Sequence, residues 1–434
     1  MKFLRAGAIY AFANIASAGV PFLLLPLLTR VLQPEAYGQV VGFSLLVTLC
    51  MSLSGLNAHA ALGVLWFKRP HEQIAAFTAT ALALALASTA LVAVLAASVI
   101  ALFPGQAGGI TPAWGAVAAI TAGATVVLQC RLVLWQSQHK PVGNALLQFS
   151  ASLLNVGISL VAVTLLGFGG DGRNGGIALS AVLMAAVSIT LFIQAGELRW
   201  SPDREQLKTL FVYGLPLVMH ILAGVALSTA DRWTVSAYLG AHALGIYGAG
   251  AQLGMVMAIL ADAFVKAYGP WLYARLSSGR PDDKLCAMGA IYVSMPAFVA
   301  IASVVGVVLV WASSTLLGPQ YRAAASVLPW FMLGGAFSGV YLSTSVLFFF
   351  AGRTGLLATA TSCAAVCGAT TTWFLVASLG VDGAAVGYAL TQGILALLTS
   401  LTAFRAFDLP WRDPVKALTA WRHQALGVAP RQPA

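Results

Sequence analysis

Apolar residues run along the chain in blocks of about 20 to 28 positions, long enough for a helix to cross a ~30 Å hydrocarbon core. Short polar breaks separate the blocks. The pattern predicts twelve membrane spans, near residues 6–29, 40–63, 77–103, 112–134, 143–167, 177–196, 211–238, 244–266, 287–311, 325–350, 356–378 and 385–404. The first block exceeds the roughly 7–15 apolar residues of a cleaved signal, so we expect it to stay as a first helix.

The apolar pattern also repeats, with six spans as the unit. Similar short motifs recur in the same order in both halves: Leu32–Gly38 and Leu239–Gly245, Gln138–Gly143 and Ala351–Gly355, Asn174–Ala178 and Asp382–Val386. An even number of spans returns the chain to the same side, so an axis along the membrane normal would relate the halves. The sequence predicts an all-α integral membrane protein with two six-helix lobes, 1–200 and 201–405, and a basic cytoplasmic tail, 406–434.

Composition agrees with this reading and excludes a soluble enzyme. Apolar residues make up 59% of the 434 positions and charged residues 8%, against roughly a quarter charged in soluble domains. The loops are too short to fold into a catalytic domain. The chain has no G-x-S-x-G elbow, no Walker loop and no H-E-x-x-H pair, so we expect neither enzymatic activity nor a cofactor.

The net charge of +10 comes from 23 Lys and Arg residues, and their placement differs between the two sides of the membrane. With the N-terminus inside, the outer segments keep only four of the 23 Lys and Arg residues, namely Arg30, Arg173, Arg232 and Arg322. This asymmetry predicts that both termini are cytoplasmic. The outer breaks Phe168–Gly176 and Leu379–Ala384 are expected to be short glycine-rich loops. The basic balance therefore gives no reason to expect a nucleic-acid partner.

The five cysteines indicate neither disulfides nor a metal site. All lie in or at the edge of apolar blocks, and their number is odd. Cys363 and Cys367 are spaced to share a helix face, but no histidine or carboxylate lies near them in the sequence. We interpret them as small packing residues.

Charged residues within the spans are the candidate functional groups, since charge in lipid is expensive and usually marks a pathway or a pair. Asp231 and Arg232 are neighbours, so on a helix they point about 100° apart and each needs its own partner. A cavity role is one interpretation. In the other, Asp231 pins a second helix and Arg232 extends to the interface.

The remaining candidates allow two interpretations each. Asp262 and Lys266 have the i, i+4 spacing of an ion pair, and the repeat aligns Lys266 with His59. Arg30 and Arg131 lie at the outer and inner ends of spans, where anchoring and topology explain them without a substrate. Our hypothesis assigns substrate binding to Arg232, Lys266, His59, Arg30 and Arg131, and coupling or structural pairing to Asp231 and Asp262.

Several short motifs resemble the landmarks of bacterial polysaccharide-unit flippases. The first half has Pro26-Leu-Leu-Thr-Arg30, Leu32-x-Pro-x-x-Tyr-Gly38 and Gly55-Leu56. The second half has Asp231-Arg232, Leu239-Gly with Gly245-Ile-Tyr247, Tyr268-Gly-Pro-Trp271, Ala351-Gly-Arg353 and Gly380-x-x-Gly383. The resemblance covers essentially the whole chain. In one departure, Asn57 and His59 occupy the inner end of the second span, where many relatives carry an arginine.

The resemblance implies a member of the multidrug/oligosaccharidyl-lipid/polysaccharide exporter superfamily. Its polysaccharide branch moves an undecaprenyl-diphosphate-linked oligosaccharide across the cytoplasmic membrane, in O-antigen, lipopolysaccharide or exopolysaccharide synthesis. The implied partners are that lipid-linked oligosaccharide, the bilayer, and a polysaccharide polymerase and chain-length regulator.

Three other classes compete with this interpretation. A drug antiporter of the same superfamily would share the architecture, but the carboxylates that usually drive it are missing from the N-terminal spans. A membrane-embedded glycosyl polymerase would need a sizeable charged outer loop. A major-facilitator carrier would usually show a Gly-x-x-x-Asp-Arg turn, whereas this chain has Leu65-Trp-Phe-Lys-Arg-Pro70 there.

Overall fold

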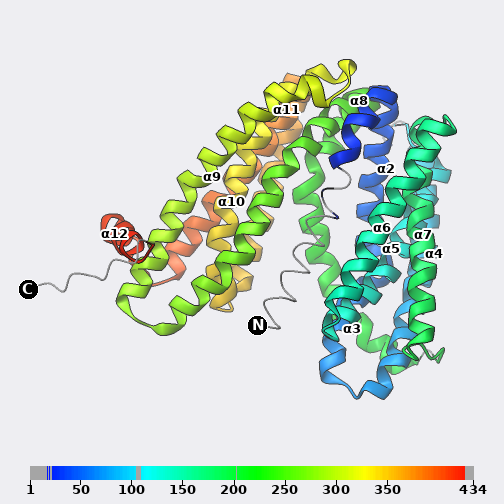
Figure 1. Ribbon diagram of the computed structural model, residues 1–434, viewed down its shortest axis with the longest axis horizontal. Helices are drawn as coiled ribbons and strands as arrows, with labels where there is room; N and C mark the ends of the chain where they lie inside the picture. The colour runs from blue at the N-terminus through cyan, green and yellow to red at the C-terminus, as the bar shows by residue number, and fades with distance from the viewer. Residues whose placement is uncertain (1–16, 18, 20–21, 104–108, 202, 426–434) are drawn as a thin grey trace, which may run out of the picture. The chain divides into compact units, whose positions relative to one another are not determined.

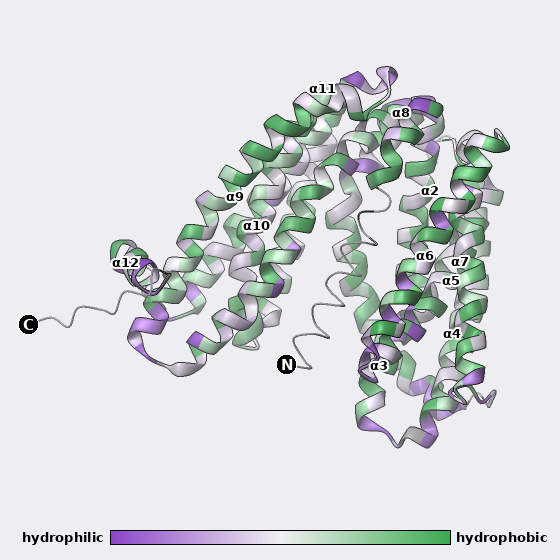
Figure 2. Cartoon of the chain, viewed as in Figure 1, coloured by the Kyte–Doolittle hydropathy of each residue, from purple (hydrophilic) through white to green (hydrophobic). Residues whose placement is uncertain are grey.

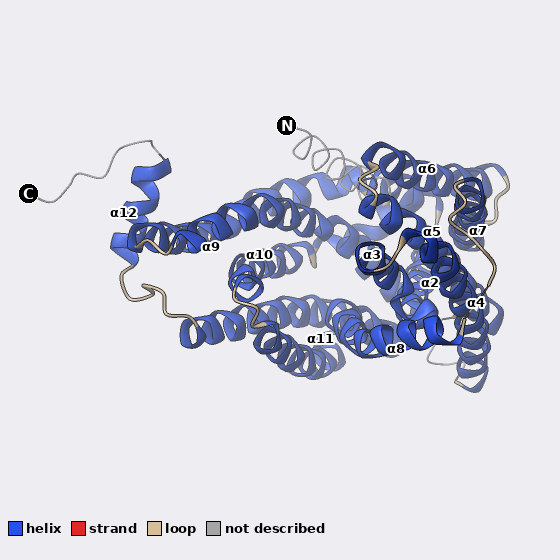
Figure 3. Ribbon diagram, turned by 90° about the horizontal axis from the view of Figure 1, so that it is seen from below, coloured by secondary structure: helices blue, strands red, loops and turns tan. Residues whose placement is uncertain are grey.

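The computed structural model describes residues 17, 19, 22–103, 109–201 and 203–425. Within these ranges every regular element is a helix (Figures 1 and 3), and no strand occurs in the described part of the chain. Most of the first predicted span, 6–29, lies outside the described residues, and the visible part is a helix over Phe22–Val31.

The first half continues through α2 (Pro34–Leu53), a 3₁₀ turn η1 (Ser54–Asn57), α3 (Ala58–Lys68) and α4 (His71–Leu102). It then forms α5 (Pro112–Ser137), α6 (Pro141–Leu160), a π-helical turn η3 (Val161–Leu165) and α7 (Gly169–Gln194). The second half comprises α8 (Arg204–Ser278), α9 (Pro281–Leu316), a 3₁₀ segment η4 (Pro319–Ala325), α10 (Leu328–Phe350), α11 (Thr354–Ala406) and α12 (Pro414–Ala425).

Nine helices in the described ranges are long and apolar enough to cross a membrane. Two of them, α8 and α11, each contain two spans joined at a kink. The 75-residue α8 breaks at Gly240 (φ 77°), and the 53-residue α11 breaks at Gly380 (φ 64°). Glycine adopts these left-handed angles without the Cβ clash that other residues suffer. With both helices divided there and Phe22–Val31 counted as the end of the first span, the spans number twelve, as the sequence predicted.

The chain forms two compact units. Unit 1 contains the described residues up to Ala249 together with Thr315–Arg322, and unit 2 contains Gly250–Ser314 and the described residues from Ala323 onward. This division by contacts falls inside α8. The lobe boundary near residue 200, which was read from the sequence repeat, stays a prediction.

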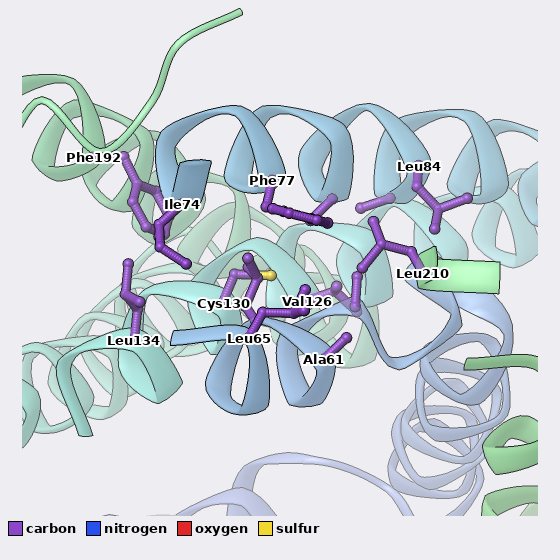
Figure 4. Packing of buried hydrophobic residues seen from close by; sticks show 14 residues of the cluster. Ala61, Leu65, Ile74, Phe77, Leu84, Val126, Cys130, Leu134, Phe192 and Leu210 are labelled. Carbon is purple, nitrogen blue, oxygen red and sulfur yellow. The ribbon is translucent and has the colours of Figure 1, made fainter. Parts of the chain in front are cut away.

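Unit 1 has a core of tightly packed apolar side chains from α3, α4, α5, α7 and the start of α8. Figure 4 shows this cluster, with Ile74 next to Phe192 and with Cys130 and Val126 on α5 at its centre. Lipid is as apolar as a leucine side chain, so such a core is held by close van der Waals packing rather than by exclusion from water.

Many large apolar side chains are exposed, and the ribbon coloured by hydropathy is green along much of most helices (Figure 2). On α9, Val304, Val307 and Trp311 are 66%, 72% and 81% exposed. A soluble protein rarely shows such a contiguous apolar face. This exposed face of α9 is suited to contact the hydrocarbon chains of a lipid bilayer.

Two repeated motifs meet inside unit 1. A Cβ atom built on Gly38 in α2 would lie 1.8 Å from the carbonyl oxygen of Ala241, and one built on Gly245 would lie 1.8 Å from that of Pro34. The contacts are reciprocal, because each glycine faces the backbone beside the other. Small residues at a crossing allow two helix backbones to approach closely, so these glycines fix the distance between α2 and the second part of α8.

Unit 2 has its own core from α8, α9, α10 and α11, and the predicted tail contributes to it. Helix α12 packs on α9: Ala417 is fully buried, and the Sγ atom of Cys286 lies 2.7 Å from Oε1 of Gln424. Part of the basic tail is therefore an ordered helix on unit 2.

The predicted outer loop Phe168–Gly176 is wrong. Helix α7 begins at Gly169, eight residues before the predicted span. The glycines suggested a loop because of their low helix propensity, but in the structure they allow α7 to pack closely on α6. The segment Leu379–Ala384 is likewise helical except at Gly380.

Candidate functional site

The second span is interrupted at the position where the sequence motif Gly55-Leu56 occurs. Gly55, Leu56 and Asn57 have φ values of 70°, 44° and 57°, a left-handed conformation that is strained for leucine. Gly55 donates its backbone N–H to Oγ of Ser88 on α4, at 2.7 Å. Strained backbone inside a membrane span is typical of functional or moving segments, so this break is a candidate hinge.

Three buried polar atoms surround the break and find no hydrogen-bond partner among the described residues. They are Oγ of Ser54, Nδ2 of Asn57 and Nδ1 of His59. Unsatisfied buried polar atoms are rare in native structures and often mark a functional position. His59, a predicted substrate contact, therefore lies at an unusual site, half-buried in α3.

Arg232 and Asp231 on α8 have separate surroundings, as their adjacency required. Asp231 is buried and accepts a 2.6 Å hydrogen bond from the hydroxyl of Tyr247 in the second part of α8. Arg232 is half-buried and donates to the carbonyl of Ser228 in its own helix, at 3.3 Å. Asp231 thus holds another helical segment, whereas the Arg232 guanidinium has no carboxylate partner among the described residues.

Arg30 closes a helix end. Its Nη2 donates to the carbonyl oxygen of Thr315 at 2.6 Å, in the last turn of α9. The final carbonyls of a helix have no partner within the helix, and a basic side chain there satisfies one of them. Arg30 is otherwise exposed, so this contact gives it a structural role.

Arg131 on α5 is held inside unit 1, although its Nε atom forms no hydrogen bond with a described residue. Its side chain is 2% exposed, forms a salt bridge with Glu197, and lies 4.3 Å from the ring centre of Trp135 and 4.8 Å from that of Phe192. Gln138 donates to the other carboxylate oxygen of Glu197 at 2.6 Å. This arrangement fastens the segment after α7 to α5.

Lys266 and Asp262 form the ion pair that their spacing predicted, with Nζ 2.6 Å from Oδ2. Both side chains are substantially exposed, at 49% and 61%. An exposed pair of this kind contributes little stability, so Lys266 remains available to a ligand.

The structure distributes the candidates over both units. Arg30, His59, Arg131, Asp231 and Arg232 belong to unit 1, and Lys266 and Asp262 belong to unit 2. Within unit 1 the phenol of Tyr37 lies within electrostatic range of both Arg232 and Arg173. Among the described residues, no two of the predicted substrate contacts share a hydrogen bond or a salt bridge.

Arg173 is the residue that sequence reasoning missed. The prediction placed it in an outer loop, but it is 8% exposed inside unit 1. A signal was present, because Gly172 and Gly176 have the small-x-x-x-small spacing of a close helix crossing, and the arginine lies between them.

Solved structures that resemble this chain show its fold. An inward-facing multidrug resistance MATE family transporter of the MOP superfamily matches with a TM-score of 0.71, at 16% identity, over 91% of this chain and 94% of that one. The lipid II flippase MurJ in an inward closed conformation matches with a TM-score of 0.66, at 14% identity, over 98% and 91%. The predicted all-α, twelve-helix, two-lobe transporter fold is confirmed.

Sequence comparison gives the family. The family model for "Polysaccharide biosynthesis protein" matches residues 3–274, more than half of the chain, and this protein belongs to that family. A protein of the Lsg locus of Haemophilus influenzae is 25% identical over 370 residues, which cover 82% of this chain and 87% of that relative.

Proposed function

We propose that this protein is a flippase that moves an undecaprenyl-diphosphate-linked oligosaccharide from the inner to the outer leaflet of the cytoplasmic membrane. Membership of the polysaccharide biosynthesis family supports the glycan, and the shared fold with a lipid II flippase supports a lipid-linked substrate. The protein would act without covalent chemistry, as a transporter rather than an enzyme.

The observation that carries the proposal is the half-buried Arg232, whose guanidinium has no carboxylate partner in the described part of the chain. A diphosphate brings about two negative charges into ~30 Å of hydrocarbon, and guanidinium groups bind phosphate through paired, charge-assisted hydrogen bonds. Arg232 would be the principal phosphate contact. Lys266 and Arg30 would contribute further positive charge, His59 would do so only when protonated, and Arg131 would act mainly through its salt bridge.

A drug antiporter is the second candidate, because a MATE transporter shares the fold. Such an antiporter needs titratable carboxylates to couple cation movement. All thirteen acidic residues lie in the described part of the chain. In the helices from α2 to α7 the acidic residues are only Glu35, Glu72 and Asp171, each in the first turn of its helix. This distribution favours the flippase.

The proposal includes the predicted orientation, with both termini cytoplasmic, and a function beside a polysaccharide polymerase and a chain-length regulator. Surface glycans such as O-antigen, lipopolysaccharide or exopolysaccharide would be the products of that pathway.

A reconstituted assay tests the function. Purified full-length protein is placed in vesicles that contain a fluorescent undecaprenyl-diphosphate oligosaccharide, and an external glycosidase reports which leaflet holds the glycan. We expect the protein to let the enzyme reach the whole pool, against about half in protein-free vesicles. If the inner-leaflet pool stays protected while the same vesicles exchange a cationic drug for protons, the antiporter replaces the flippase.

A further inference from the structure

Arg173 is a buried cation on α7 that is hydrogen-bonded to two residues of α6. Its Nη1 donates to Oδ1 of Asn155 at 2.6 Å and to Oγ of Ser159 at 2.5 Å, both on α6. A guanidinium has five N–H donors. Those on Nε and Nη2 form no hydrogen bond with any described residue.

Close packing of α6 on α7 creates this arrangement. A Cβ built on Gly176 would lie 2.8 Å from Cα of Ser159, and one built on Gly172 would lie 3.0 Å from the carbonyl oxygen of Ala162. The two glycines therefore bring α6 against α7 on either side of Arg173. The π-helical turn η3, a feature frequent at functional sites, follows directly after α6 and contains Ala162.

The second half of the chain has an equivalent close contact between two helical segments, and it contains no cation. Within α11, a Cβ on Gly387 would lie 2.9 Å from Cα of Thr372, and one on Gly383 would lie 2.0 Å from the carbonyl oxygen of Leu375. The residue that follows the first glycine of this pair is Ala384, which is fully buried. The packing of the fold therefore does not require an arginine at this position, and Arg173 is an addition to it.

No protein carboxylate neutralises Arg173. All thirteen acidic residues belong to the described part of the chain, and within it the salt bridges are those of Arg131, Lys266 and Lys416. The contrast with Arg131 is direct, because that buried arginine has Glu197. A buried charge without a counterion is strongly unfavourable.

A pocket of about 290 Å³ in unit 1, partly open to its surroundings, lies beside Arg173. Its polar lining includes Thr121, Thr125, Ser152 and Asn155. The threonine and serine hydroxyls donate to carbonyls of their own helices, at 2.7 to 3.2 Å. Arg173 is thus the only charged group on the wall, and the wall contains no carboxylate.

From this geometry we infer that the cavity binds one small monovalent inorganic anion, such as chloride, as the counterion of Arg173. One uncompensated positive charge calls for one negative charge. By the same measure of volume, about 10–15 Å³ is enough for one water, so the pocket has room for a partly hydrated ion. Its volume is at the lower limit of pockets for drug-sized ligands, so it fits a small ion better than a glycosyl diphosphate.

Chloride binding by the purified full-length protein tests the inference. The protein is equilibrated in detergent with radioactive chloride, and gluconate keeps the ionic strength constant. We expect saturable binding of about one chloride per chain. Bromide and nitrate should compete for the site, whereas gluconate should not.

The decisive variant is Asn155→Asp, which puts a carboxylate oxygen where the amide oxygen now accepts from Arg173. The variant keeps the arginine and supplies an internal counterion, so the Kd for chloride should rise at least tenfold without loss of folding. Gln194→Glu adds the same charge at an exposed position near the other end of α7 and should leave chloride binding unchanged.

Absence of saturable binding in the wild-type protein would overturn the inference. Undiminished binding in Asn155→Asp would overturn it equally, since the chloride would then be bound elsewhere. The measurement uses no glycan, so its outcome is separate from that of the flippase assay.

Discussion

Substituting Gly38 by alanine tests the glycine crossing that joins the two repeated motifs. The new Cβ would lie 1.8 Å from the carbonyl oxygen of Ala241, and its next contact would be a backbone carbon at 2.7 Å. Both atoms belong to backbone, so no side chain can rotate away. Opening the contact from 1.8 to 3.0 Å, still a tight distance, requires the helices to separate by about 1.2 Å.

Separation of that size disturbs every contact along the crossing, because packed interiors transmit strain. Overpacking costs about 1–3 kcal/mol and occasionally more, and a backbone clash belongs at the upper end. Gly245→Ala should cost a similar amount, because its contact with Pro34 is the reciprocal one. The double variant should cost less than the sum, since one displacement of the helices accommodates both methyl groups.

Thermal unfolding in detergent measures these effects. A thiol-reactive dye labels the exposed Cys363 and Cys367 first, and its further reaction with the buried Cys50, Cys130 and Cys286 reports unfolding. Gly157→Ala is the matched control, because Gly157 lies inside α6 with no atom within 4 Å of its Cβ position, and alanine there should be neutral or slightly stabilising. If Gly38→Ala unfolds at the same temperature as Gly157→Ala, α2 and α8 do not meet as described.

Three further substitutions separate structural from functional charges. Glu197→Gln leaves the buried Arg131 without its counterion and should destabilise the protein by about 3–5 kcal/mol, as a lower unfolding midpoint will show. Tyr247→Phe removes the hydrogen bond to the buried Asp231 and should cost about 1–3 kcal/mol in the same assay; an unchanged midpoint would mean that water replaces the hydroxyl. Lys266→Ala breaks only an exposed ion pair, so it should cost less than about 1 kcal/mol while reducing glycan transport. Full transport by this variant would remove lysine from the substrate site.

The sequence predicted the spans well because their apolar length follows from the thickness of the bilayer. It failed for the start of α7. A run that contains Gly169, Gly172 and Gly176 has low helix propensity, and only its contact with α6 makes it helical. The break at Gly55–Asn57 was also missed, because its apolar neighbours continue the pattern of a single span.

The candidate site was predictable only in part. Spacing along one helix sufficed for the pair of Lys266 with Asp262, since both partners are local in sequence. The partners of Arg131 and Arg30 are far away in sequence, at Glu197 and at the Thr315 carbonyl, and nothing in the local pattern indicates them. Arg173 was misplaced for the same reason, because its burial depends on the packing of two helices.

Replacing Arg232 tests the central claim most directly, namely that an unpaired intramembrane cation binds the diphosphate. In a strain that lacks its own flippase, variants are compared for surface-glycan display, with protein level checked by blot. We expect Arg232→Ala to abolish display although the protein still inserts, Arg232→Lys to retain part of it, and Arg322→Ala, at an exposed position in η4, to match the wild type. Normal display from Arg232→Ala would contradict the claim and show that this arginine does not bind the substrate.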